Sequence, residues 1–310
     1  MWIFKKLKKK EDDKMQFEKI AREWLEYKKT SIKESTYFNY MFIVSKYLLP
    51  EFKEKNIEEI NNYNYFIQNL MQKLSNKSVR DIINVLKSIL NYYEDEYNSV
   101  LQIKRINLPK VSKKKIKILS DNERKVLENY SLQDNSLKSV GIVVALNTGM
   151  RIGEICSLKW KNIDLSNKQI YVENTIQRVY DEENKTTDII IDNPKTDSSI
   201  RSIPINTKLY KCLKKLENKF DREDYFLSGN NKKYVEPRNY QYYFKSILRK
   251  CELKPYKFHS LRHTFATHCI EVGMDAKSLS EILGHSDVKI TLGIYVQSND
   301  KIKQKFLEKL

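Results

Sequence analysis

The stretch KFHSLRHTFATHCIEVGMDAKSLSEILGHSDVKITLGIYVQ, residues 257–297, contains all four histidines of the chain. Its apolar residues recur at helical spacing, and His259 and Arg262 lie three residues apart, about 4.5 Å along a helix and on one face. Two glycines are placed to end two helices, so His285 should lie just beyond the second helix. Tyr295 follows in a third apolar segment. We therefore expect three helices that bring together a base, a cation and a hydroxyl.

A tyrosine, histidines and arginines are the groups with which a protein hydroxyl can cleave a phosphodiester: a nucleophile, a proton acceptor and donors for phosphate oxygens. Taken alone, a histidine or tyrosine on an apolar helix is more often a core residue, and Tyr295 is one of 20 tyrosines. Two upstream segments favour the functional interpretation, ALNTGMRIGEI at 145–155 and NPKTDSSIRSIPI at 193–205. With these segments the chain resembles the tyrosine recombinase (integrase) family, in the branch of phages and conjugative elements, over about residues 119–300.

The resemblance implies a nucleophile and two proton-transfer residues. Tyr295 would attack a DNA phosphate, forming a 3′-phosphotyrosyl bond and releasing a 5′ hydroxyl. The ordinary pKa of a phenol is about 10, so a base is needed, and His259 is the candidate. Lys195, in a polar turn, would protonate the leaving 5′ oxygen. His263 and His268 have no role in this scheme, and we expect them to pack.

The resemblance also implies the phosphate donors. Arg151, Arg262 and His285 would donate to the non-bridging oxygens, where charge grows in the transition state. Glu154 lies one helical turn after Arg151 and is expected to orient its guanidinium, because apolar neighbours argue against a simple surface ion pair. Arginine and lysine cations supply the positive charge, and the sequence lacks the carboxylate cluster of a two-metal nuclease. We therefore expect no metal and no other cofactor.

Composition and charge limit the number of domains and the class of partner that the chain can have. The chain has 310 residues, enough for two domains with cores of their own. Its 57 Lys and Arg residues against 40 Asp and Glu give a net charge of +17, which favours a polyanionic partner. We expect nucleic acid and no membrane, because the sequence has no basic amphipathic anchor, signal peptide or apolar run of about 20 residues. The four cysteines have no paired or metal-like spacing, so we expect buried, reduced thiols in a cytoplasmic protein that is associated with the nucleoid.

The periodicity predicts a mainly α fold with a small antiparallel sheet (α+β), beginning with a bundle of four helices. The resemblance implies that this core-binding (SAM-like) bundle and a tyrosine recombinase catalytic domain form a C-shaped clamp on DNA. With about 14 residues before the bundle, we expect no separate arm-binding domain. The expected segments are a basic N-terminal tail (1–14), the helical core-binding domain (15–98), a basic linker (99–118), the catalytic domain (119–299) and a C-terminal tail helix (300–310).

Several element boundaries can be predicted. The second bundle helix should stop at Pro50, and the third should span 57–74. Ser120 and Glu123 form a capping box at the start of the catalytic domain, and an apolar run predicts a buried helix over 140–146. We further expect one small sheet and two later helices, with strands at 169–173, 175–180, 187–192 and 200–205 and helices at 209–220 and 239–251.

Basic and aromatic residues in three places are candidates for further contacts with DNA. The start of the second helix is suited to backbone phosphates, although its tyrosines could instead pack inward. The linker is an extended basic segment that would gain affinity by counterion release, and one later helix has a charged face that could equally be solvated. The candidates are Lys33, Tyr37, Tyr40, Lys104, Arg105, Lys113, Lys114, Lys115 and Arg249.

The expected partner is double-stranded DNA with paired core sites. The resemblance implies a monomer in solution and a homotetramer on DNA, with an accessory DNA-bending or directionality protein as a further candidate partner. The tail at 300–310 carries an apolar stripe that must dock, either on its own domain or on a neighbouring protomer. Two other functions stay open, a type IB topoisomerase-like enzyme that relaxes DNA and a DNA-binding protein that has lost catalysis.

Overall fold

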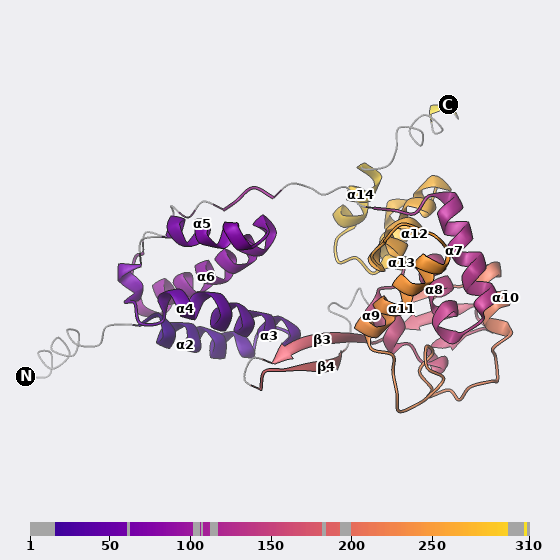
Figure 1. Cartoon of the computed structure of the whole chain (residues 1–310), viewed down its shortest axis with the longest axis horizontal. Helices are drawn as coiled ribbons and strands as arrows, with labels where there is room; N and C mark the ends of the chain where they lie inside the picture. The colour runs from indigo at the N-terminus through magenta and orange to yellow at the C-terminus, as the bar shows by residue number, and fades with distance from the viewer. Residues whose placement is uncertain are drawn as a thin grey trace, which may run out of the picture. The chain divides into compact units, whose positions relative to one another are not determined.

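The computed structural model describes residues 16–60, 63–101, 106, 108–111, 117–181, 184–192, 200–296 and 307–308 of the chain. The chain divides into two compact units (Figure 1). As far as they are described, the first comprises Met1–Lys114 and Val179–Asp188, and the second comprises Lys115–Arg178 and Ile189–Leu310. Each unit has a hydrophobic core of its own. No helix in the described part of the chain is long and apolar enough to cross a membrane.

The first unit is a bundle of helices built from apolar residues at helical spacing. Phe17, Ile20 and Trp24 lie on one face of its first helix and are fully buried. Trp24 also donates its indole N–H to Ser88 Oγ (3.2 Å), which satisfies its polar atom in the core. The helices are α2 (Phe17–Lys29), α3 (Glu34–Ile43), a π-helical segment (Val44–Leu48), α4 (Leu49–Phe52), a 3₁₀ turn (Ile57–Glu59), α5 (Tyr63–Lys73) and α6 (Asn76–Tyr97).

The second helix does not stop at Pro50, so that prediction is wrong. The segment Val44–Leu48 is π-helical, and after its wider turn the N–H of Leu49 bonds the carbonyl of Val44. α4 begins at once, and Pro50 occupies its first turn, where the missing N–H has no helical partner to lose. The single helix predicted over 57–74 is also wrong at its start, where the 3₁₀ turn precedes α5.

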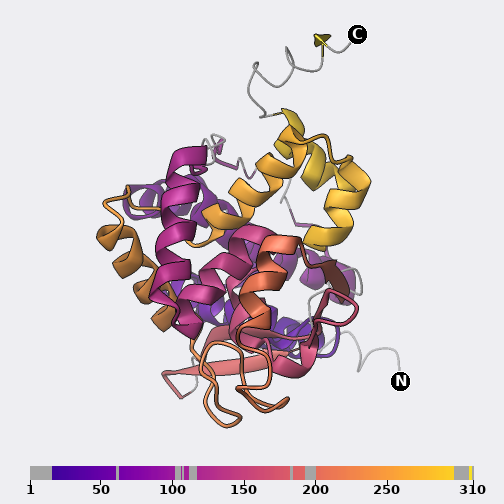
Figure 2. The same ribbon diagram turned by 90° about the vertical axis from the view of Figure 1, so that its right-hand side faces the viewer.

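In the second unit, α8 is the central helix. Its apolar run at 140–146, predicted as a buried helix, is buried at every position, and α8 packs against α7, α10, α11 and α12. The predicted capping box is present, because Ser120 Oγ and the Glu123 carboxylate each accept from the other residue's backbone N–H. Helices α12, α13 and α14 contact one another and form one group (gold in Figure 2). The helices are α7 (Asp121–Asp134), α8 (Leu137–Thr148), α9 (Ile152–Ser157), α10 (Thr207–Lys214), α11 (Pro237–Lys250), α12 (His259–Glu271), α13 (Ala276–Leu283) and α14 (Val288–Val296).

The strands form two sheets, whereas we predicted one. β1 (Ile163–Asp164), β2 (Gln169–Val172) and β5 (Arg201–Pro204) make an antiparallel sheet in the order β1-β2-β5. β3 (Thr175–Asp181) and β4 (Thr186–Asp192) pair separately. Because β2 is paired on both sides, β3 has no free edge of β2 to join, although it follows β2 directly in the chain.

The distal part of the β3–β4 pair groups with the first unit, although it falls within the range predicted for the catalytic domain. In that unit the ring of Tyr180 meets the ring of Phe42 edge-on, with 5.8 Å between centroids. Such an arrangement places the positive ring edge against the negative ring face. The four cysteines are free: Cys156 and Cys269 are buried as expected, and the other two are half-buried.

Several predicted features lie outside the described residues. They are the basic N-terminal tail at 1–14, the catalytic candidate Lys195, most of the C-terminal tail at 300–310, and the linker candidates Lys104, Arg105, Lys113, Lys114 and Lys115.

Candidate active site

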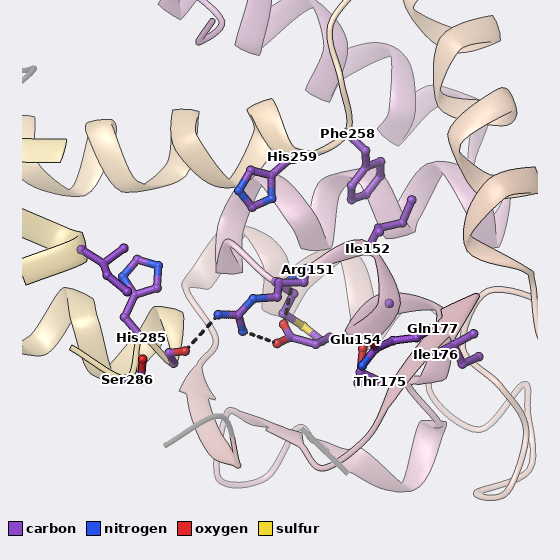
Figure 3. A pocket seen from close by; sticks show the side chains of 14 residues that line it. Arg151, Ile152, Glu154, Thr175, Ile176, Gln177, Phe258, His259, His285 and Ser286 are labelled. Atoms are coloured by element: carbon purple, nitrogen blue, oxygen red, sulfur yellow. Dashed lines mark hydrogen bonds and ion pairs between the residues drawn. The ribbon is translucent and has the colours of Figure 1, made fainter. Parts of the chain in front are cut away.

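A cavity of about 530 Å³ lies in the second unit. Its walls come from the start of α9, the first part of β3, the start of α12 and the loop between α13 and α14 (Figure 3). Of the residues predicted for the site, Arg151, Glu154, His259 and His285 line this cavity. The fold therefore brings together candidates from segments more than 100 positions apart in the sequence.

Arg151 and Glu154 are held together at the start of α9. Glu154 Oε1 accepts from Arg151 Nη1 (2.7 Å), and its other oxygen accepts from the backbone N–H of Arg151 (2.7 Å). The Glu154 side chain is 2% exposed, so this is not a surface ion pair. The geometry agrees with the expected orienting role, because the carboxylate fixes one edge of the guanidinium next to the cavity.

Arg201, on β5, is a second partner of Glu154 that the sequence analysis missed. Its Nη2 lies 3.0 Å from Glu154 Oε2 and its Nη1 lies 3.2 Å from Oε1, and its side chain is only 5% exposed. Burial acts to raise the pKa of Glu154, but Arg201 and Arg151 together hold it below its usual range. The carboxylate therefore stays ionised inside the protein, because two guanidinium groups share it.

Three arginines bind three consecutive carbonyls at the C-terminal end of α13. The last carbonyls of a helix have no partner within the helix, and this end of the helix dipole favours cations. Each guanidinium thus holds the loop that carries His285. The pairs are Arg201 Nε to Ile282 O (2.6 Å), Arg262 Nη2 to Leu283 O (2.7 Å) and Arg151 Nη2 to Gly284 O (3.0 Å).

Arg262, predicted as a phosphate donor, is buried and does not line the cavity. Its side chain is 4% exposed, and its Nη1 donates to the carbonyl of Gly149 (2.9 Å). It therefore ties the end of α8 to the end of α13 behind the cavity, and its charge acts on the site from there.

Gly284 is required at the end of α13 for two reasons. Its φ is +64°, a left-handed conformation that other residues adopt at a cost. A Cβ atom at this position would also lie 3.0 Å from Cδ and Nη1 of Arg201. The glycine thus allows the chain to turn towards His285 while Arg201 packs against its backbone.

His259 begins α12 and points into the cavity (Figure 3). Its ring meets that of His263, one helical turn later, edge-on at 4.6 Å. Partial desolvation, together with His263 and the nearby Arg262 and Arg151, lowers the pKa of His259 to about 4. The imidazole is therefore neutral at pH 7, so one of its ring nitrogens carries no proton. His268 lies at the other end of α12, where its Nδ1 is 3.7 Å from Glu271, outside the cavity.

His285 follows Gly284 directly and faces the same cavity. Partial desolvation lowers its pKa to about 4, and the charges of Arg262 and Arg151 act in the same direction. Its Nδ1 lies 2.8 Å from the hydroxyl oxygen of Thr291 on α14. This contact, like that of Arg201, was not predicted from the sequence. A threonine in an apolar helical segment gives no signal beyond its place on the buried stripe.

The structure does not locate every predicted residue. Lys195 is outside the described residues, and Tyr295 is described only by its place in the backbone of α14. Of the other DNA-contact candidates, Tyr40 stacks on Trp24 at 5.1 Å, the inward packing that we considered as the alternative. Arg249 is exposed near the end of α11.

Residues 111–301 match the Phage integrase family, and residues 16–75 match the Phage integrase, N-terminal SAM-like domain. The chain is 32% identical to a protein named "Tyrosine recombinase XerC-like" from Caldanaerobacter subterraneus subsp. tengcongensis, over 94% of this chain and 81% of that protein. The chain belongs to the phage integrase family of tyrosine recombinases. The predicted family, mainly helical fold and recombinase activity are thereby confirmed, and this integrase is a site-specific DNA recombinase.

Solved structures of other integrases share the fold. The Tn1549 transposon integrase in complex with a circular intermediate DNA superimposes with a TM-score of 0.76 at 20% identity, covering 96% of this integrase and all of that chain. A lambda integrase tetramer bound to a Holliday junction gives a TM-score of 0.66 at 16% identity, covering 93% of this integrase and 79% of that chain.

Proposed function

We propose that this integrase cleaves and rejoins DNA of a mobile element through a covalent 3′-phosphotyrosyl intermediate on Tyr295. The observation that carries the proposal is the cavity, in which a fixed guanidinium and two neutral imidazoles meet beside α14, the helix that contains Tyr295. One phosphodiester group is the substrate that such a set of donors and acceptors suits.

The positive charge of the site would bind the phosphate. Arg151 presents its guanidinium at the cavity with its orientation set by Glu154 and by the carbonyl of Gly284. Arg262 adds charge from behind, and His285 offers a ring nitrogen. Because these donors are positioned before the substrate arrives, they stabilise the growing charge of the transition state without reorganisation.

Proton transfer would use the remaining candidates. Neutral His259 can take the phenolic proton from Tyr295, whose ordinary pKa of about 10 prevents ionisation at pH 7. In this scheme Lys195 protonates the 5′ oxygen as the P–O bond breaks and the tyrosyl–phosphate bond forms. The bond energy stays in the phosphotyrosine, so the 5′ hydroxyl of another strand can reverse the step and exchange strands.

The partner we propose is double-stranded DNA with paired core sites, bound by a tetramer of this chain in the cytoplasm. Solved relatives bound to DNA and to a Holliday junction support this proposal, as does the net charge of +17. Monomers in solution and an accessory DNA-bending protein belong to the same proposal. The candidates Lys33, Tyr37 and Arg249 would contact the backbone of the duplex.

The experiment is to capture the covalent intermediate. The protein is incubated with sheared genomic DNA of its host and denatured with detergent, and the DNA that stays attached is sequenced. Tyr295→Phe should form no adduct but should bind the recovered sequence with nearly unchanged affinity, since the phenolic oxygen acts only in the chemistry. A protease-sensitive, denaturation-resistant complex from this variant would show that another residue is the nucleophile.

A second assay separates recombination from the alternatives. A plasmid with two copies of the recovered site should yield exchanged products with the wild-type protein. Relaxation of supercoils without exchange would indicate a topoisomerase-like activity, and binding alone would indicate a catalytically silent protein.

A further inference from the structure

Thr291 is a buried polar residue that contacts the active site from α14. Its side chain is fully buried, and its Oγ1 lies 2.8 Å from Nδ1 of His285. Two other buried threonines, Thr148 and Thr264, donate to the carbonyl four residues before them in their own helices. Among the described residues, His285 is the hydrogen-bond partner of the Thr291 hydroxyl.

The charge state of His285 makes this contact chemically important. Its pKa of about 4 leaves the ring neutral at pH 7, so one ring nitrogen carries a hydrogen and the other accepts. If Nδ1 carried the hydrogen, Nε2 would present a lone pair to an anionic phosphate and repel it. If Thr291 donates to Nδ1, the hydrogen lies on Nε2, which can then donate to a phosphate oxygen.

We propose that Thr291 is a positioning residue that donates to Nδ1 of His285 and so fixes the tautomer in which Nε2–H serves the phosphate. This inference rests on the proposed function, in which His285 is a phosphate donor. The backbone assists, because the N–H of His285 donates to the carbonyl of Ser280 (3.1 Å) and holds the residue at the end of α13.

The position of Thr291 in α14 links the orientation of His285 to the position of Tyr295. Thr291 lies four residues, about one helical turn, before Tyr295 in α14. The helix that carries the nucleophile therefore also supplies the hydroxyl that orients His285. A displacement of α14 from α13 would therefore move Thr291 away from His285 and move Tyr295 with it.

The test compares Thr291→Val, which keeps the shape and removes the hydroxyl, with Thr291→Ser, which keeps the hydroxyl. Imidazole ¹H–¹⁵N correlation spectra of the full chain, without DNA, report the tautomer, and His285→Ala assigns the signal among four histidines. We expect Nε2–H in the wild-type protein and in Thr291→Ser, and a mixed or reversed tautomer in Thr291→Val.

Single-turnover cleavage of a nicked duplex, with the sequence recovered from the covalent adduct, gives the second readout. Thr291→Val should be slower by about 10- to 100-fold, less than the roughly 10²–10³ typical of a lost oxyanion donor. Thr291→Ser should restore most of the rate. In a His285→Ala background, Thr291→Val should cause no further loss, because the hydroxyl acts through His285.

The outcomes separate this inference from the proposed function. Nδ1–H in the wild-type protein, or an unaltered tautomer in Thr291→Val, overturns the inference. A full additional loss in the His285→Ala background also overturns it, since Thr291 would then act independently of the histidine. An altered tautomer with an unaltered cleavage rate leaves the tautomer assignment intact and refutes His285 as a phosphate donor.

Discussion

Replacing Arg201 with methionine tests whether the buried arginine and carboxylate group holds the second unit together. Arg201→Met keeps most of the apolar stem but removes the ion pair with Glu154 and the hydrogen bond to the carbonyl of Ile282. Both charged side chains are at most 5% exposed, so water cannot replace the lost partner. Breaking such a buried pair from one side costs about 3–5 kcal/mol. We expect a value near the lower end, because Arg151 still pairs with Glu154.

For a domain of about 150–250 residues, each kcal/mol lowers the melting temperature by roughly 2–4 °C, so a cost of about 3 kcal/mol should lower it by about 6–12 °C. Scanning calorimetry of the full chain measures this change in melting temperature. Because each unit has its own core, the transition of the second unit can be followed by itself. The matched control is Lys161→Met, which breaks a 2.9 Å pair with Glu223 in the same unit, with side chains 42% and 55% exposed. The control should cost under about 1 kcal/mol. Equal shifts for the two variants would refute our reasoning that the buried group stabilises the fold.

Three further predictions concern the metal and salt dependence of the reaction, the protonation of His259 and the C-terminal tail. Cleavage should proceed undiminished in excess EDTA. The affinity for DNA should fall by about 10³-fold or more between 50 and 200 mM salt. A loss of cleavage in EDTA that Mg²⁺ restores would contradict the proposed mechanism. The pKa of His259 in the free, folded protein should be about 4, below its ordinary value of 6.5. As pH falls, this histidine is therefore protonated in the unfolded chain before it is protonated in the folded chain. The free energy of unfolding should accordingly decrease as pH falls from about 6.5 towards 4. An NMR titration midpoint near 6.5 would disprove this. Deletion of residues 300–310 should leave a folded monomer that binds one half-site but does not recombine two sites; equal recombination would rule out docking of the tail on a neighbouring protomer.

Periodicity predicted most of the helices, because burial of an apolar stripe dominates helix formation, but the helix predicted over 209–220 ends at Lys214. These predictions failed where backbone hydrogen bonding, which the apolar pattern does not show, determined the structure. At Pro50 the sequence rule assumes an α-helical ladder, but the π-helical turn at Val44–Leu48 shifts the ladder, so that the proline falls in the first turn of a new helical segment. The division into two sheets depends on which strand pairs with the edges of β2, and alternation within each strand carries no information about that choice.

Only part of the site could be predicted from the sequence. His259, Arg151 and His285 were identified by motif, and the fold brings them to one cavity. Arg201 was missed because arginine is rarely buried, so a single arginine on a short strand is normally interpreted as exposed. Its role depends on contacts that are distant in the sequence, with Glu154 at 47 positions and with the carbonyl of Ile282 at 81 positions.

The three arginine contacts at the end of α13 use backbone oxygens of residues 282–284, which every amino acid possesses. Natural variation in the side chains at 282 and 283 is therefore compatible with these contacts, provided that the apolar packing is kept. A change in the length of this segment would have a different effect from a change of side chain. Inserting or removing one residue would move all three carbonyls away from their guanidinium partners together, and it would displace the histidine that follows them. Among relatives, we expect the side chains at 282 and 283 to vary and the length of this segment to be constant.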